Sequence, residues 1–338
     1  MTDFFAKTPL DAAIFEQEIR PWLPPVVFDA HVHVSLKEHC GPVSAERFKQ
    51  IWAMEVGIDQ SWECLRANYA TLFPGIEVQS LVFGGVYYEL DISKENAYVL
   101  RGALDPANQS LALYVIKPDE SPGAIQKAIS DGFIGIKPYP DLSPSGIEDC
   151  SVFDFLPHEH LRVLNQLKGV LMLHISRPGR IADADNVREI LDINDRYPDI
   201  RIILAHVGRA FCLPTAEKGL PQLADRPGIL TDISANLNAD VFAFAIETLG
   251  VDRILFGSDL PITMMRGVRE HVGEKYINYT DQPYSWNTNR KPPEEESTYT
   301  FYLYEELRAL ISAAKQTCIG VAGVHKIMNE NAQALLKR

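Results

Sequence analysis

Several histidine and carboxylate side chains of this sequence follow short apolar runs, at positions where they could share one metal ion. His31 and His33 end the run VVFDAHVH, and residues two apart in a strand point to the same side. Further candidates lie near the ends of later apolar runs: His174 in VLMLHIS, His206 in RIILAHV and Asp259 in ILFGSD. Imidazole and carboxylate groups are the ligands that a zinc-like divalent ion takes. A single histidine after a strand is usually an ordinary buried polar group, so the prediction of a metal site depends on the whole set.

Other polar residues at the ends of the same runs could bind a substrate. Lys137 and Tyr139 end the run FIGIKPY, and Arg177 and Arg209 follow the runs VLMLHIS and RIILAHV. Because arginine is the preferred planar partner of carboxylates, we expect Arg177 and Arg209, together with Tyr139, to contact a small carboxylate-bearing molecule. Pairing with neighbouring carboxylates of the protein is the alternative for both arginines.

Eight short apolar runs are the elements that would position these residues. They span residues 26–33, 78–85, 111–116, 133–139, 170–176, 201–207, 229–234 and 254–259. Segments with helical spacing, such as 182–198 and 238–250, separate most of them. Near-continuous apolar strands that alternate with helices are typical of a buried parallel sheet, and eight such units predict a (β/α)8 TIM barrel. An open doubly wound sheet is the alternative, but the first run is not followed by a G-x-G-x-x-G turn.

The remaining segments predict one barrel domain over residues 1–338. We expect a leading helix over 1–25, the barrel strands within 26–260, a long loop over 261–300 and closing helices over 301–338. Long excursions follow the first and the eighth run, at the end of the barrel where active sites lie. We therefore expect these excursions to form lids or walls of the site.

The composition limits the partners and the compartment that we expect. With a net charge of -13 and no local basic stripe, the chain is a poor candidate for binding nucleic acid or an anionic membrane. No run is long enough to span a bilayer, and the first residues lack a signal-peptide pattern. The five cysteines have no paired spacing, which is typical of reduced thiols. We therefore expect a cytoplasmic protein that acts on a small molecule.

Four motifs, HVH, LHIS, LAHVGR and FGSDLP, together resemble those of the amidohydrolase superfamily. They are most similar to its amidohydrolase-2-related branch, which contains aminocarboxymuconate-semialdehyde decarboxylase and 2-pyrone-4,6-dicarboxylate lactonase. The resemblance covers nearly the whole chain, from His31 to the closing KIMNENAQALL. It implies a metal-dependent TIM-barrel enzyme. It also leaves a homodimer open, because such barrels often associate through their outer helices.

The resemblance implies a role for each matching residue. His31, His33 and His174 match metal ligands, and His206 matches a histidine that either ligates the metal or hydrogen-bonds the catalytic water. Asp259 matches a residue that is a metal ligand or a proton shuttle. The implied cofactor is one divalent metal ion, and zinc is the ion we expect.

Two further residues keep open roles. Lys137 lies where other branches of the superfamily carry a carboxylated lysine that bridges two metal ions. In the branch that this chain resembles, the lysine is usually not carboxylated and one metal ion suffices, so we favour a substrate-side cation or a salt bridge. Two metal ions would follow if Lys137 were carboxylated. Asp232 in LTDIS either orients a metal ligand or caps the next segment.

Three hypotheses for the function follow. In the first, which we favour, a metal-activated water hydrolyses an amide, ester or lactone, Asp259 moves the proton and His206 orients the water. In the second, the same residues serve a metal-dependent decarboxylase of a small unsaturated or aromatic carboxylic acid. Release of CO2 distinguishes the two reactions. In the third, the barrel only binds a ligand, but every expected ligand position is filled, which argues against it.

Overall fold

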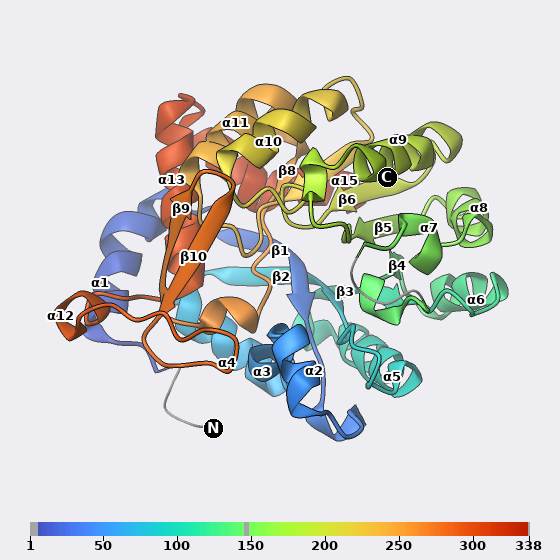
Figure 1. Ribbon diagram of the computed structural model, residues 1–338, viewed down its shortest axis with the longest axis horizontal. Coiled ribbons are helices and arrows are strands. Elements are labelled where there is room, and N and C mark those ends of the chain that lie inside the picture. The colour runs from blue at the N-terminus through green and yellow to red at the C-terminus, as the bar shows by residue number, and fades with distance from the viewer. Residues whose placement is uncertain (1–5, 145–148, 337–338) are drawn as a thin grey trace.

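The structure is a computed structural model that describes residues 6–144 and 149–336. Eight parallel strands form its centre: β1 Val26–His33, β2 Glu77–Phe83, β3 Ser110–Val115, β4 Gly135–Lys137, β5 Val170–Leu173, β6 Arg201–Leu204, β7 Ile229–Asp232 and β8 Ile254–Leu255. Each strand pairs with the next along the chain, in the order β1 to β8 (Figure 1). The strands lie within or next to the predicted apolar runs, and the predicted (β/α)8 barrel is confirmed.

Hydrogen bonds between β1 and the chain around β8 close the barrel. The amide N–H of Ala30 donates to the Phe256 carbonyl at 2.9 Å, and that of His33 donates to the Leu260 carbonyl at 3.1 Å. Between them, the amide of Asp259 donates to the carbonyl of His31 at 2.8 Å. Closure therefore places the histidines of the first strand directly beside the carboxylate that follows the last.

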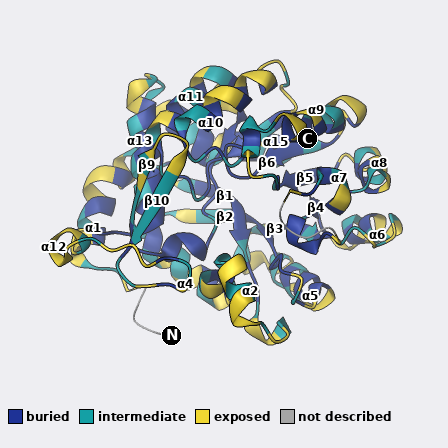
Figure 2. Ribbon diagram, viewed as in Figure 1, coloured by how far each residue is buried: buried dark blue, intermediate teal, exposed yellow. Residues whose placement is uncertain are grey.

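Helices cover the outside of the barrel. They include α5 Ile92–Ala103, α6 Gly123–Asp131, α8 His158–Gln166, α9 Ala184–Arg196, α10 Leu213–Gly219, α11 Ala239–Leu249 and the closing helices α13 Tyr302–Gln316, α14 Gly320–His325 and α15 Asn331–Leu336. Side-chain caps fix some starts: Asp183 accepts from the amide of Asn186 at 3.1 Å, and Asn238 from that of Asp240 at 3.1 Å. Exposed residues lie on the outer faces of the helices, and buried residues fill the centre (Figure 2). No helix in the described ranges combines the length and apolar character that a membrane span needs.

Strand β1 contains an irregularity that decides which way its histidines face. Phe28 and Ala30 pack in the interior of the barrel, whereas Val27 and Val32 pack against the surrounding helices. Strict alternation would put the side chains of Val32 and Ala30 on the same face of the strand. The face that points to the barrel interior therefore changes between these two residues. The pairing with β2 shifts register between Asp29 and Val32, as expected for a β-bulge with one extra residue.

Two excursions rise above the carboxyl ends of the strands. The first follows β1 and contains α2 Ala45–Gln50, α3 Ala53–Gly57 and α4 Trp62–Leu72. The second follows β8 and contains an antiparallel hairpin, β9 Gly267–Val272 and β10 Lys275–Thr280, which packs beside α13 (Figure 1). The long loop expected over 261–300 therefore includes a regular hairpin, which turns at Gly273 with a φ of 59°.

Candidate active site

Eight of the nine predicted site residues line one cavity above the strand ends. They are His31, His33, Lys137, Tyr139, His174, His206, Arg209 and Asp259. The cavity has a volume of about 460 Å³, within the range of roughly 300–1,000 Å³ that small-molecule sites occupy. The excursion after β1 adds Trp52 to the wall, and the hairpin adds Arg269 and Tyr276. The expectation that both excursions wall the site therefore agrees with the structure.

The β-bulge in β1 turns His31 and His33 into the cavity, where both rings face Asp259. The Nε2 atoms of His31 and His33 lie 3.7 and 3.5 Å from Oδ1 of Asp259. The opposite ring nitrogens are held from behind: Nδ1 of His31 lies 2.9 Å from Asp232, and Nδ1 of His33 lies 3.1 Å from the Gly84 carbonyl. This arrangement fixes both rings with Nε2 forward, as is usual for metal-ligating histidines.

The spacing of these atoms fits a shared divalent cation. Two ligand atoms about 2.1 Å from one tetrahedral zinc ion lie about 3.4 Å apart. The two Nε2 to Oδ1 separations of 3.7 and 3.5 Å are close to that value and long for hydrogen bonds. The ligand atoms of His31, His33 and Asp259 all lie within 4.8 Å of one another, so this donor set can hold a metal.

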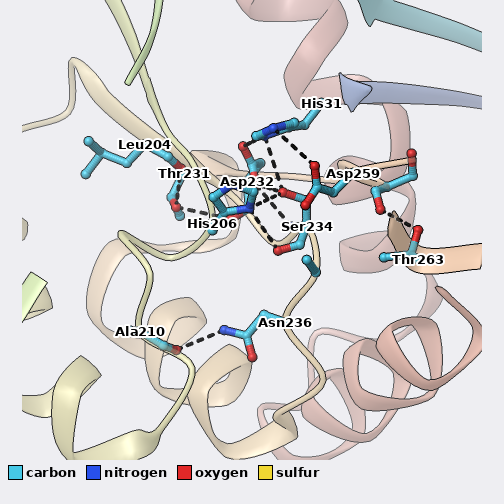
Figure 3. A network of polar contacts seen from close by, with 12 residues as sticks. His31, Leu204, His206, Ala210, Thr231, Asp232, Ser234, Asn236, Asp259 and Thr263 are labelled. Carbon is cyan, nitrogen blue, oxygen red and sulfur yellow. Dashed lines mark hydrogen bonds and ion pairs between the residues drawn. The ribbon is translucent and has the colours of Figure 1, made fainter. Parts of the chain in front are cut away.

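A second polar group lies beneath the first and centres on Asp232 and Ser234 (Figure 3). Asp232 accepts from His31 with one carboxylate oxygen and from the backbone amide of Ser234, at 3.1 Å, with the other. The hydroxyl of Ser234 lies 2.7 Å from Nδ1 of His206. Of the two roles left open for Asp232, its contact with His31 fits that of orienting a ring. Ser234, two residues further in LTDIS, was missed by sequence reasoning.

His174 and Lys137 lie in the same cavity without a hydrogen-bond partner among the described residues. Nδ1 of His174 and Nζ of Lys137 are buried and unpaired. His174 belongs to neither group of close ligand atoms, although its ring centre lies 5.3 Å from that of His206. The structure therefore brings His174 to the cavity but leaves it outside the ligand set of His31, His33 and Asp259.

Burial and mutual charge shift the titration of these groups. Burial opposes ionisation of Asp259, but its polar contact with His33 and the charge that the surrounding histidines can carry outweigh it and hold its pKa below the usual range. Burial lowers the pKa of Lys137 to about 8, against the opposing pull of Asp232 and Asp259. Burial also lowers the pKa of His206. At neutral pH the cavity therefore holds the ionised carboxylate of Asp259 beside the neutral imidazole of His206.

The two predicted substrate arginines have different environments. Arg209 lines the cavity, and its Nη1 donates to the carbonyls of Ile175 and Ser176 at 3.0 and 2.7 Å. The guanidinium of Arg177 instead binds Glu189 of α9, with N–O distances of 2.8 and 2.9 Å. Arg177 is not among the residues that line the cavity. Its geometry therefore matches the alternative, a pair with a neighbouring carboxylate.

The backbone around the cavity is strained at several non-glycine residues. His206, Arg209, Ala235 and Asp259 have φ values of 105°, 60°, 52° and 54°. Such left-handed conformations each cost about 1–3 kcal/mol and tend to cluster at functional sites. The turns after β6, β7 and β8 are thus shaped to aim these side chains into the cavity.

Comparisons with known proteins concern the family and the fold of the chain. A family model described as amidohydrolase matches residues 91–338. The search among curated proteins found no significant match.

Solved structures share the barrel fold at low sequence identity. One is a probable 2-pyrone-4,6-dicarboxylic acid hydrolase from Acinetobacter baumannii with citric acid bound: 15% identity, TM-score 0.57, and coverage of 92% of this chain and 99% of that one. Another is 5-carboxyvanillate decarboxylase from Novosphingobium aromaticivorans, complexed with manganese and 4-hydroxy-3-methoxy-5-nitrobenzoic acid. Its sequence identity is 14% and its TM-score 0.58, and the match covers 93% of this chain and 96% of that one. A third is an amidohydrolase from Burkholderia multivorans with bound zinc. Its sequence identity is 13% and its TM-score 0.59, and the match covers 92% of this chain and 99% of that one.

Proposed function

The chain belongs to the amidohydrolase family, and from this premise we propose that it is a metal-dependent hydrolase. Its substrate would be an amide, ester or lactone of a small molecule that carries a carboxylate. Both hydrolases and decarboxylases occur among the proteins that share its fold. The choice of hydrolysis therefore rests on the residues of the cavity.

The metal would be held by His31, His33 and Asp259, whose ligand atoms face one another. One ion, for which zinc is our expectation, fits this set. A divalent ion of this kind polarises a carbonyl group and makes water more acidic. His174 and His206 line the same cavity.

The protein's own residues would move the proton. Asp259, whose pKa is held low, is ionised and accepts a proton from the attacking water through a carboxylate oxygen. The water oxygen bonds to the carbonyl carbon, the bond to the leaving nitrogen or oxygen breaks, and Asp259 returns the proton to that atom. His206, fixed by Ser234 at Nδ1, would present Nε2 to the water and orient it.

Arg209 would bind the carboxylate of the substrate. Its guanidinium is anchored by two backbone carbonyls and has no carboxylate partner among the described residues. Tyr139 lines the cavity nearby, with its ring centre 4.8 Å from that of His174. An anchored cation that lacks a counter-ion can bind a carboxylate without prior rearrangement.

The observation that carries the proposal is the position of one ionised carboxylate oxygen of Asp259 between two imidazoles that are fixed from behind. With Oδ1 facing the two rings as a metal ligand, Oδ2 of the same carboxylate is the atom that would accept the proton, and a pure binding protein has no need for such an acceptor. Because the same carboxylate can serve a water and a leaving group in turn, the geometry favours hydrolysis.

Decarboxylation remains the second candidate because of Lys137. Its buried, unpaired ammonium lies in the cavity with a pKa of about 8, so it could donate a proton to the carbon that loses CO2. In that reaction the carbon–carboxyl bond breaks, CO2 leaves and the electron pair takes the proton from Nζ.

Metal content tests the proposed site directly. Elemental analysis of protein purified without added metal or chelator should find about one ion per chain. The same analysis of the H31A/H33A variant should find almost none, because two of the three ligands are gone. H158A, a histidine replacement on the outer helix α8, is the control and should keep the metal. Metal retained in H31A/H33A would contradict the site, and two ions per chain would indicate a carboxylated Lys137.

Product analysis separates the two reactions. We expect the metal-loaded protein to hydrolyse members of a panel of carboxylate-bearing lactones, esters and amides without release of CO2. Stoichiometric CO2 from aromatic or unsaturated carboxylic acids would establish the second candidate instead.

A further inference from the structure

Asp29 is a fully buried carboxylate in the irregular part of β1, and it has no part in the proposed reaction. It does not line the cavity. Its Oδ1 accepts from the backbone N–H groups of His31 and Ser258, at 3.1 and 2.8 Å. Its Oδ2 accepts from the hydroxyls of Ser258 and Tyr69, at 2.5 and 2.8 Å. Both oxygens of this carboxylate are therefore occupied by neutral donors from three different segments of the chain.

The contact with His31 supports the β-bulge that directs the two histidines. The pairing of β1 with β2 shifts register between Asp29 and Val32, and the N–H of His31 lies in that interval. A bulge leaves its extra residue without a regular ladder partner, so a backbone donor there needs another acceptor. Asp29 supplies one from two residues earlier, as aspartate does in an Asx turn. Its side chain thus stabilises the conformation in which His31 and His33 face the cavity.

The contact with Ser258 reaches the segment that carries the third ligand. Ser258 directly precedes Asp259, and Asp29 accepts from both its amide and its hydroxyl. The same hydroxyl accepts from the N–H of Leu260 at 3.1 Å. Between these two contacts Asp259 adopts its φ of 54°, a left-handed conformation that surrounding contacts must enforce in a non-glycine residue. Asp29 therefore helps to hold the turn that presents the Asp259 carboxylate.

One carboxylate thus joins the two segments whose ligand atoms must meet. The Nε2 atoms of His31 and His33 lie 3.7 and 3.5 Å from Oδ1 of Asp259, and the offset between β1 and the turn after β8 sets both separations. Ligand atoms must stay within about 0.2 Å of the ideal metal distances for a strong site. A small slip of one segment against the other is therefore enough to weaken metal binding.

We propose, on the basis of the metal site in the proposed function, that Asp29 is a positioning residue that sets the metal affinity. It acts by holding the backbone at His31 and Ser258 in one fixed arrangement, without contact with the ion. Tyr69 of α4 holds the carboxylate from the helix side. The role depends on hydrogen bonding rather than on the charge of Asp29, which makes it separable by experiment.

Zinc affinity of the full-length variants tests the proposal, measured by competition with a chromophoric chelator at a temperature where each variant is folded. D29A should raise the Kd about tenfold to a hundredfold, as loss of supporting contacts around a metal site does. D29N should restore most of the affinity, because its amide oxygen can accept from both backbone N–H groups and its NH2 can donate to both hydroxyls. A D29N variant as weak as D29A would overturn the proposal, and so would an unchanged Kd in D29A.

S258A and Y69F form a matched pair that also decides the matter if D29A does not fold. Each removes one hydroxyl that donates to the same oxygen of Asp29, and neither residue lines the cavity. Ser258 adjoins the ligand Asp259, so S258A should raise the zinc Kd about twofold to tenfold, the value of one hydrogen bond. Y69F should leave it within about twofold of the wild type, because α4 carries none of the three ligands. Equal effects of the two variants would overturn the proposal.

Hydrogen exchange of the metal-free protein, followed by mass spectrometry, gives a readout that needs no ion. Peptides that contain His31 and Ser258 should exchange faster in D29A than in the wild type, whereas a peptide from α9 should exchange equally in both. Unchanged exchange in the first two peptides would overturn the role of Asp29. Faster exchange in D29A together with a wild type that binds no zinc would instead overturn the proposed metal site, and with it the proposed function.

Discussion

Replacement of Asp232 by alanine should weaken metal binding, although Asp232 contacts the metal site only through His31. Its carboxylate lies 2.9 Å from Nδ1 of His31, and both side chains are buried. Loss of the acceptor leaves that N–H unpaired and frees the ring to turn Nε2 away from Asp259. A hydrogen bond to a charged group contributes about 1.5–3 kcal/mol, which corresponds to roughly tenfold to a hundredfold in affinity. Loss of such supporting contacts to metal-bound histidines typically costs the same range.

Ser234 sets the lower end of this estimate. Its hydroxyl lies 3.3 Å from Nδ1 of His31 and could replace part of the lost contact. We therefore expect the Kd of D232A for zinc to rise about tenfold or more. In D232N, which keeps an acceptor oxygen but loses the charge, the rise should be smaller. Competition with a chromophoric chelator at neutral pH measures both values.

Asp11 supplies the matched control for Asp232. It is another fully buried aspartate, but its partner is Arg266, at 2.9 Å, and neither residue lines the cavity. D11A should lower the melting temperature and leave the zinc Kd unchanged. An unchanged Kd in D232A would refute the supporting role of Asp232, and so would a loss of affinity in D11A as large as that in D232A.

Two other variants test separate parts of the structure. R209M should raise the KM for a carboxylate-bearing substrate about tenfold to a hundredfold because an anchored cation is lost, while zinc affinity stays unchanged; an unaltered KM would remove Arg209 from the substrate site. Burial raises the pKa of Glu306 well above its usual value, so the folded chain keeps it protonated, whereas the unfolded chain ionises it near a pH of about 4.3. Folding stability attributable to Glu306 therefore falls as the pH rises above that value. E306Q should raise the melting temperature more at pH 8 than at pH 4, and an equal effect at both would contradict the assignment.

Much of the barrel could be predicted because its strands are local patterns. A strand buried on both faces must be apolar over its whole length, so each β-strand is visible as a short run of residues. The candidate metal and catalytic residues were predictable for the same reason, since parallel strands bring their carboxyl ends to one edge. His31, His33, His206 and Asp259 could thus be grouped in advance, although their roles stay predictions.

The parts that escaped prediction depend on contacts that no local pattern encodes. Arg177 follows a strand just as Arg209 follows the next, yet a glutamate one helix away binds the first and backbone carbonyls anchor the second. The hairpin segment GVREHVGEKYINYT contains a possible turn residue in Gly273, but its position over the cavity depends on tertiary contacts. Arg269 could not be selected as a cavity residue before that position was known.

The β-bulge in β1 has a consequence for protein engineering. A His-x-His spacing guarantees that two rings share a side of the strand, but it leaves open which side that is. On a regular barrel strand in which Phe28 and Ala30 face the interior, the two histidines would alternate with these residues. Both rings would then face the helical layer, away from the carboxylate of Asp259. A one-residue deletion between Asp29 and Val32 should do the same here, exchanging the histidines for Val32 and its neighbours at the cavity wall. The unit to transfer is therefore the motif together with its extra residue. A designer who copies only the two histidines would obtain a stable barrel without the metal site.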